Sequence, residues 1–267
     1  MGCGEGRVQH FIQQLESLPE KSLVLLEEPE TSLHQSAQFE LGRYLIDVCI
    51  RRKHQVLLTT HAESLLASLP SACRIYIDRS TGNIRPINGL SSAQAASLMA
   101  NAATKALQIL VEDPVGKAVL TEIIRRSDAT FLRTVEIHSS GDKDALQRIM
   151  QTLSGTSLAL AAVRDADTGA SPKQNLFSLP GTKPPEKEIF ECPSVGQYLH
   201  DQYSLHLADF MTAADQNDHH AWFGALAHAV CADEATVTTE CARVYVSSLP
   251  ENDCDALVGQ LKAAIKR

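Results

Sequence analysis

The chain has 267 residues, of which 44% are hydrophobic and 21% charged, a composition typical of a globular protein with about two domains. This composition excludes disordered, collagen-like and coiled-coil proteins, and no apolar run is long enough to predict a transmembrane helix. The net charge of −8 repels phosphate on average, so a nucleic-acid partner requires a local basic patch or a bridging cation.

Apolar runs and an amphipathic stretch alternate in the first third of the chain. Residues 23–26 and 56–60 predict buried strands, and residues 75–77 predict a third strand. Between the first two strands, residues 35–53 place apolar side chains on one helical face. This order is typical of a parallel sheet with helical crossovers. Glycine and proline residues then break the pattern, and residues 91–104 predict a connecting helix.

The middle of the chain repeats the alternation. Strands and helices are predicted in turn at residues 107–111, 115–126, 135–137, 142–153 and 158–163. Residues 168–188 are rich in glycine, proline, serine and lysine and predict a loop. The remainder, from about residue 195, predicts mainly helices. The whole chain therefore predicts an α/β protein.

Carboxylates follow the first predicted strand directly, in the Glu-Glu-Pro-Glu run of residues 27–30. Ligands of open parallel sheets lie beyond the carboxyl ends of the strands. One carboxylate there can hold Mg²⁺, and the next can orient or deprotonate a water molecule. The second strand ends at His61, which could contact a γ-phosphate from the neighbouring strand end. The alternative is a solvated turn, which such runs often form.

These motifs resemble the C-terminal half of an ABC-type ATPase head, as found in SMC, RecF and OLD-family proteins. The resemblance covers residues 2 to about 80. Residues 2–6 look like the signature loop, residues 27–28 like the end of Walker B, residues 31–34 like the D-loop and residues 60–61 like the switch histidine. The resemblance implies a nucleotide site that includes Gly4, Glu5, Glu27, Glu28 and His61.

The roles implied by this resemblance differ among the acidic and imidazole groups. Glu27 is the magnesium-associated acid, Glu28 is the base or water-positioning residue, and His61 senses the γ-phosphate. The sequence contains no G-x-x-x-x-G-K-[ST] motif, which normally holds the phosphates. We therefore expect ATP to bind only with the missing Walker A half or a partner. Signature loops of ABC heads act across a dimer, which implies a homo-oligomer or a partner ATPase chain.

Acidic residues also follow two strands predicted in the middle of the chain. Glu112 and Asp113 come directly after one strand, and Asp165 and Asp167 form a D-x-D pair after another. Alternation along an extended chain places the two aspartates on the same side. If the strand ends are adjacent, three carboxylates converge, and divalent cations would relieve their repulsion. Two Mg²⁺ or Mn²⁺ ions could stabilise both oxygens of a phosphodiester displacement. The alternative is a group of solvated acids.

The pattern from about residue 106 to about residue 190 resembles the TOPRIM domain of topoisomerases, DnaG-type primases and OLD-family nucleases. A TOPRIM domain directly after an ABC head is the arrangement of OLD-family nucleases, including anti-phage effectors. The resemblance implies that Glu112, Asp165 and Asp167 are catalytic metal ligands. Gly116 stands where the family has a second acid, and Asp113 could substitute as a ligand.

Basic and imidazole side chains are weaker candidates. Lys183 could contact the scissile phosphate, and Lys187 is a slightly weaker candidate for the same role. A lysine in a proline-rich loop is, however, more often solvated. His219 and His220 precede an aromatic pair. Adjacent histidines on a helix point in different directions, so we do not expect them to share a metal ion.

Four segments are therefore expected. They are the ATPase half-head at residues 1–85, a linker helix at 86–104, a Rossmann-like TOPRIM domain at 105–195 and a helical extension at 196–267. The seven cysteines form no CxxC pair and the N-terminus lacks the apolar core of a signal peptide, which predicts a cytoplasmic protein without a membrane partner.

The function expected is a Mg²⁺- or Mn²⁺-dependent DNA endonuclease of the OLD type, coupled to an ATPase module and used in anti-phage defence. Its substrate would be DNA, and its mechanism would rest on the carboxylates described above. The alternative is a non-catalytic or ATP-sensing subunit of a DNA repair or defence complex.

Overall fold

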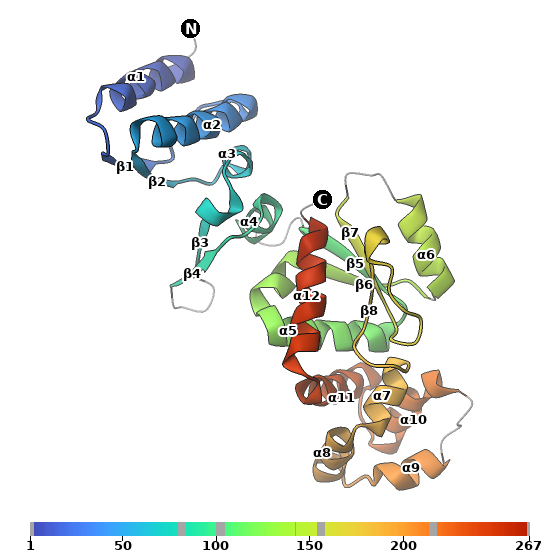
Figure 1. Cartoon of the computed structure of the whole chain (residues 1–267). Coiled ribbons are helices and arrows are strands. Elements are labelled where there is room, and N and C mark those ends of the chain that lie inside the picture. The colour runs from blue at the N-terminus through green and yellow to red at the C-terminus, as the bar shows by residue number, and fades with distance from the viewer. Residues whose placement is uncertain are drawn as a thin grey trace. The chain divides into compact units, whose positions relative to one another are not determined.

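The chain forms an α/β structure in two compact units, residues 1–104 and 105–267 (Figure 1). Each unit has its own hydrophobic core. The computed structural model describes residues 3–79, 84–99, 105–141, 143–153, 158–213 and 218–265. Among the helices in these ranges, none combines the length and apolarity that a bilayer span requires.

The first unit is built on two parallel strands and two long helices. β1 (Leu23–Glu27) pairs with β2 (Gln55–Thr59), and α2 (Gln35–Arg52) connects them. α1 (Cys3–Ser17) precedes β1. One face of the strand pair packs with both helices in a core of Leu15, Val24, Leu41, Leu45 and Val48. The predicted strands and helix are therefore present, but they form a smaller layer than a full parallel sheet.

The other face of this strand pair is open. Leu25 is 68% exposed and Leu57 61% exposed, whereas Val24, on the opposite face, is 8% exposed. The expectation that both strands are fully buried is therefore wrong. Side chains of a strand alternate between two faces, and the described helices of this unit cover only one of them.

The strand at residues 75–77 does not extend the parallel pair. β3 (Ile75–Asp78) instead pairs antiparallel with β4 (Arg85–Asn88) in a separate sheet. β4 lies in the stretch where glycine and proline predicted a break. Short helices complete the unit: α3 (Glu63–Ser68), η1 (Ser71–Cys73) and α4 (Ser92–Met99). α4 lies within the predicted connecting helix, and residues 100–104 are outside the described ranges.

The second unit contains a four-stranded parallel sheet in the order β6-β5-β7-β8. Its strands are β5 (Leu107–Val111), β6 (Val135–Ser139), β7 (Leu160–Arg164) and β8 (Leu176–Ser178). The two crossover helices are α5 (Pro114–Thr134) and α6 (Lys143–Thr152). The first three strands match the predictions. β8 does not, because it lies within the predicted loop at residues 168–188.

α5 is longer than the predicted helix and bends at Asp128, whose backbone is not helical. The Asp128 side chain accepts hydrogen bonds from the Phe131 amide at 2.9 Å and from Lys262 Nζ at 2.6 Å. These contacts let the chain continue helically beyond the bend, where the sequence pattern alone predicts an end.

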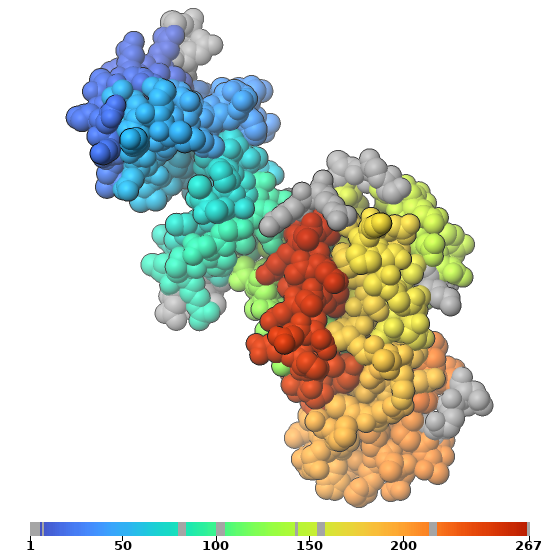
Figure 2. Space-filling model, in the orientation of Figure 1, coloured from blue at the N-terminus to red at the C-terminus, as the bar shows by residue number. Residues whose placement is uncertain are grey.

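The C-terminal helices share a core with the sheet. They are α7 (Pro185–Glu191), α8 (Pro193–Tyr203), α9 (Leu207–Ala213), α10 (Trp222–Ala229), α11 (Glu234–Ser248) and α12 (Glu251–Ile265). Two short 3-10 turns are η2 (Pro172–Gln174) and η3 (His219–Ala221). α12 packs on β7 and β8, and Figure 2 shows its red surface beside the yellow of the β8 segment. One cluster contains Val163 of the sheet, Ile123 of α5 and Leu261 of α12. The expected extension at residues 196–267 is thus part of the second unit's core.

Candidate carboxylate site and half nucleotide site

Two adjacent strands of the second unit bring their carboxyl ends together. β5 and β7 are parallel neighbours with Val111 opposite Val163, so Glu112 and Asp165 follow at the same edge of the sheet. The backbone amide of Asp165 donates a hydrogen bond to Glu112 Oε1 at 3.2 Å. The pairing of strands thus brings together two of the carboxylates that the sequence singled out.

Asp113 lies at the N-terminus of α5, where it caps the helix. Its Oδ1 accepts a hydrogen bond from the Gly116 amide at 2.7 Å. A β-carbon at position 116 would lie 3.5 Å from Asp113 Oδ1 and 3.6 Å from Asp165 Oδ1. The place of the expected second acid therefore faces the same carboxylates, and the glycine leaves it without a side chain.

The D-x-D pair does not lie on an extended strand. β7 ends at Arg164, and the chain then turns, with the Thr168 amide donating to the Asp165 carbonyl at 3.2 Å. Asp165 is 7% exposed, whereas Asp167 is exposed. The expectation that strand alternation places both side chains alike is therefore wrong. The Asp167 charge nevertheless acts on Glu112 and Asp165, which puts Asp167 near them.

Burial makes negative charge costly at this edge of the sheet. It raises the pKa of Asp165 to about 8, with further contributions from the charges of Glu112, Asp113 and Glu186. Burial also raises the pKa of Glu112, although the Asp165 amide opposes this shift. A bound cation would remove the cost of ionising both groups.

Glu186, in the first turn of α7, is a residue that sequence reasoning missed. It is 1% exposed, and burial followed by the Asp113 charge raises its pKa to about 7. The sequence places it only in the predicted loop at residues 168–188. Among the described residues, no hydrogen-bond partner reaches its Oε2.

His219 and His220 approach this carboxylate together. His220 Nδ1 lies 3.1 Å from Glu186 Oε1 and 3.9 Å from Asp113 Oδ2. The two histidine rings have centroids 4.1 Å apart. The expectation that the rings diverge is wrong, because both residues belong to the 3-10 turn η3 and their rings lie against each other.

Lys183 is held by acidic side chains at its own end of the site. Its ammonium contacts the Glu191 carboxylate, and Glu188 Oε1 accepts hydrogen bonds from the amides of Thr182 at 2.7 Å and Lys183 at 3.0 Å. In this structure the Lys183 ammonium therefore pairs with Glu191, and the expected contact with a phosphate stays a prediction. Lys187 lies near His219, since its charge adds to the effects of burial and His220 in lowering the pKa of His219.

In the first unit, Glu28 and His61 come together at the ends of β1 and β2. The Glu28 amide donates to the Thr59 carbonyl at 3.0 Å, and His61 Nε2 lies 3.7 Å from Glu28 Oε1. Glu27 is opposite Thr59 in the register, with an exposed side chain. Glu30, which the sequence did not single out as a ligand, is buried and accepts a hydrogen bond from Thr60.

The segment expected to be the signature loop is helical where it is described. Residue 2 lies outside the described ranges, and Gly4 and Glu5 belong to the first turn of α1. The prediction of a loop is therefore wrong from Cys3 onward, because these residues form the first turn of α1, which packs into the core through Leu15.

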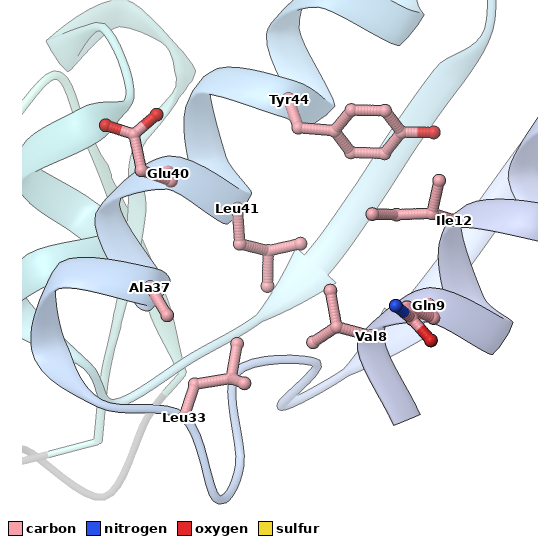
Figure 3. A pocket seen from close by; sticks show the side chains of 8 residues that line it. All are labelled: Val8, Gln9, Ile12, Leu33, Ala37, Glu40, Leu41 and Tyr44. Atoms are coloured by element: carbon pink, nitrogen blue, oxygen red, sulfur yellow. The ribbon is translucent and has the colours of Figure 1, made fainter. Parts of the chain in front are cut away.

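A hollow of about 530 Å³ lies between α1 and α2 in the first unit (Figure 3). Val8 and Ile12 of α1 and Leu41 of α2 point into it, with Leu33 before α2. Its lining is mainly apolar, which is unlike a phosphate site. The described residues that line it include none of the candidate nucleotide ligands.

Comparisons with known proteins give one family model and two solved structures. The family model "AAA ATPase domain" matches residues 8–66. The chain is similar to the C-terminal region of the Xanthomonas campestris pv. campestris OLD protein phased with mercury, with 12% identity, a TM-score of 0.34 and coverage of 61% of this chain and 95% of that one. The same region phased with platinum gives 13% identity, a TM-score of 0.33 and coverage of 61% and 92%. A comparison with curated proteins gives no match.

Proposed function

We propose that the second unit hydrolyses phosphodiester bonds of DNA with a divalent metal ion, as an endonuclease of the OLD/TOPRIM type. The observation that carries this proposal is the meeting of Glu112 and Asp165 at adjacent strand ends, joined by a backbone hydrogen bond of 3.2 Å. Asp113 stands at the same edge.

The donors at this edge fit Mg²⁺ or Mn²⁺. They are carboxylate oxygens, which hard divalent cations prefer. Asp165 is buried among other acids, which makes its ionised form unfavourable. A bound cation would offset this unfavourable energy. When bound, one or two such ions supply Lewis-acid stabilisation of the charge on the phosphodiester oxygens.

The chain's own residues have separate tasks in this proposal. Glu112 and Asp165 would hold the cation from the adjacent strand ends, and the exposed Asp167 would complete the group from the turn. Asp113 would add a carboxylate in place of the acid absent at Gly116. Lys183 would neutralise the scissile phosphate after exchanging its contact with Glu191, a motion within reach of a flexible, half-exposed side chain.

The first unit supplies one side of an ATP site in the same proposal. Glu28 and His61 already lie 3.7 Å apart, and Glu27 stands at the end of β1. Gly4 and Glu5, at the start of α1, would act on the nucleotide of another subunit. ATP then binds only with a Walker A element from elsewhere, in a homo-oligomer or with a partner ATPase chain. A cytoplasmic role in anti-phage defence rests on the motif resemblance alone.

The test uses the purified full chain, supercoiled plasmid and either Mg²⁺ or Mn²⁺. We expect nicked or linear products with the wild type and their loss with Asp165→Ala. Asp255→Ala, which removes an exposed acid from α12, is the matched control and should cleave normally. Equal cleavage by Asp165→Ala, or no cleavage by the wild type with either metal ion, would refute the proposal.

A non-catalytic or ATP-sensing subunit of a DNA repair or defence complex is the second candidate. It is favoured by the glycine at position 116 and by the engagement of Lys183 with Glu191. This alternative predicts nucleotide-dependent assembly with a partner and no cleavage at any metal concentration. Assembly can be measured by light scattering of the full chain with and without ATP.

A further inference from the structure

We propose that Glu186, His219 and His220 form a separate site for a transition-metal ion such as Zn²⁺. One ligand atom from each residue lies within 4.8 Å of the other two. Around a tetrahedral ion with bonds of about 2.0–2.1 Å, ligand atoms stand roughly 3.3 Å apart. Small side-chain rotations therefore bring the three groups onto one ion.

The carboxylate of Glu186 supplies independent support for this site. The side chain is 1% exposed, and its Oε2 has no hydrogen-bond partner among the described residues. A buried carboxylate oxygen without a partner is costly, since the charge loses its hydration without compensation. A cation held between Glu186 and the histidines would pair with that charge.

The geometry also gives the ion access and a rigid frame. Glu186 lies on α7, the histidines lie on η3, and these two elements pack on each other. The side chain of His220 is 64% exposed, so an ion can enter from solvent. Asp113 Oδ2 lies 3.9 Å from His220 Nδ1, at the border with the carboxylate site, and a water molecule would complete the coordination of the ion.

The donor set distinguishes this site from the carboxylate site. Two imidazoles and one carboxylate suit Zn²⁺ and Co²⁺, whereas Mg²⁺ prefers oxygen ligands. Glu112, Asp165 and Asp167 contribute nothing to it, so it stands whether or not the chain cleaves DNA. The rival interpretation is that His220 simply pairs with Glu186 and Asp113, and this predicts no metal binding.

The test is a titration of the metal-free full chain with Co²⁺, followed by its visible absorption, and with Zn²⁺, followed by calorimetry. We expect one ion per chain to bind with imidazole ligation. His219→Ala and His220→Ala should each weaken this binding by at least about tenfold, because even outer-shell changes cost 10–100-fold. His228→Ala on α10, an exposed histidine, is the matched control and should bind normally.

A further pair of variants separates this proposal from the proposed function. Asp165→Asn should lose Mn²⁺ binding at the carboxylate site and keep Co²⁺ binding at the histidines. Unfolding curves in EDTA establish that each variant folds. Glu186→Gln should also weaken Co²⁺ binding, and if this variant fails to fold, the two histidine variants decide, since their side chains are less buried. Co²⁺ affinity unchanged in both histidine variants would overturn the proposal.

Discussion

Replacing Asp165 with asparagine should stabilise the metal-free protein at neutral pH. The Asp165 carboxyl is buried beside Glu112, Asp113 and Glu186, and this burial raises its pKa to about 8. The folded second unit must therefore either hold a proton there or bear a buried negative charge. Asparagine has nearly the same shape as aspartate, but it needs no bound proton and carries no charge.

The size of the effect follows from the difference between pH 7 and the ordinary aspartate pKa of 3.8. At about 1.4 kcal/mol per pH unit, the upper limit is about 4 kcal/mol at pH 7. Relaxation and water entry reduce this, so we expect a gain in the free energy of unfolding of roughly 2 kcal/mol. The pKa is higher in the folded state, so the penalty is absent below pH 4, grows as the pH rises towards 8 and is constant above.

The assay is urea unfolding in EDTA at several pH values, followed by the fluorescence of Trp222. This residue is the chain's single tryptophan and is buried in the second unit, so it reports on that unit alone. Asp167→Asn, which changes an exposed acid, is the control and should shift stability by less than about 0.5 kcal/mol. A variant at position 165 no more stable than wild type at pH 7, or equally stabilised at pH 4, would refute the reasoning.

Three further predictions concern packing and backbone conformation. Val24→Ala should lower the free energy of unfolding of the first unit by about 1–2 kcal/mol, whereas Leu25→Ala on the exposed face should change it by less than about 0.5 kcal/mol. Circular-dichroism melts measure both, and equal losses would contradict the one-sided burial of the strand pair. Asp233→Ala should cost about 1 kcal/mol, because Asp233 accepts the Thr236 amide at the N-terminus of α11, and an unchanged melting temperature would count against this cap. Gly181→Ala should cost more than about 1 kcal/mol and speed proteolysis of its loop, since φ is +123° and the new β-carbon would lie 2.8 Å from Glu188 Oε1; wild-type resistance to protease would show that the loop adapts.

Much of the second unit's framework could be predicted from the sequence. Strands such as residues 107–111 are short apolar runs, and their order with helices indicates a parallel sheet. Glu112 and Asp165 stand at strand ends, so their meeting required only that β5 and β7 be neighbours. β8 could not be found in this way, because three residues are too few for a periodic pattern.

Other features depend on contacts that no local pattern records. The alternation of residues 23–26 does not say whether a second layer covers the strand, so the exposure of Leu25 could not be predicted. Glu186 and His220 are 34 positions apart, and only the packing of α7 on η3 brings them together. The direction of two adjacent histidine rings likewise depends on the 3-10 turn that carries them.

The sheet and the C-terminal helices of the second unit share one core, and this limits where the chain can be truncated. Arg126 of α5 donates to the carbonyl of Leu249 at 3.0 Å and to that of Val246, so the crossover helix is fastened to the end of α11. A fragment that ends at residue 195, where the motifs end, would lack α11 and α12, which pack on α5, and would expose the apolar side of α5 to solvent. The position of α5, which begins beside the acids near residue 112, thus depends on contacts with amino acids more than a hundred positions downstream.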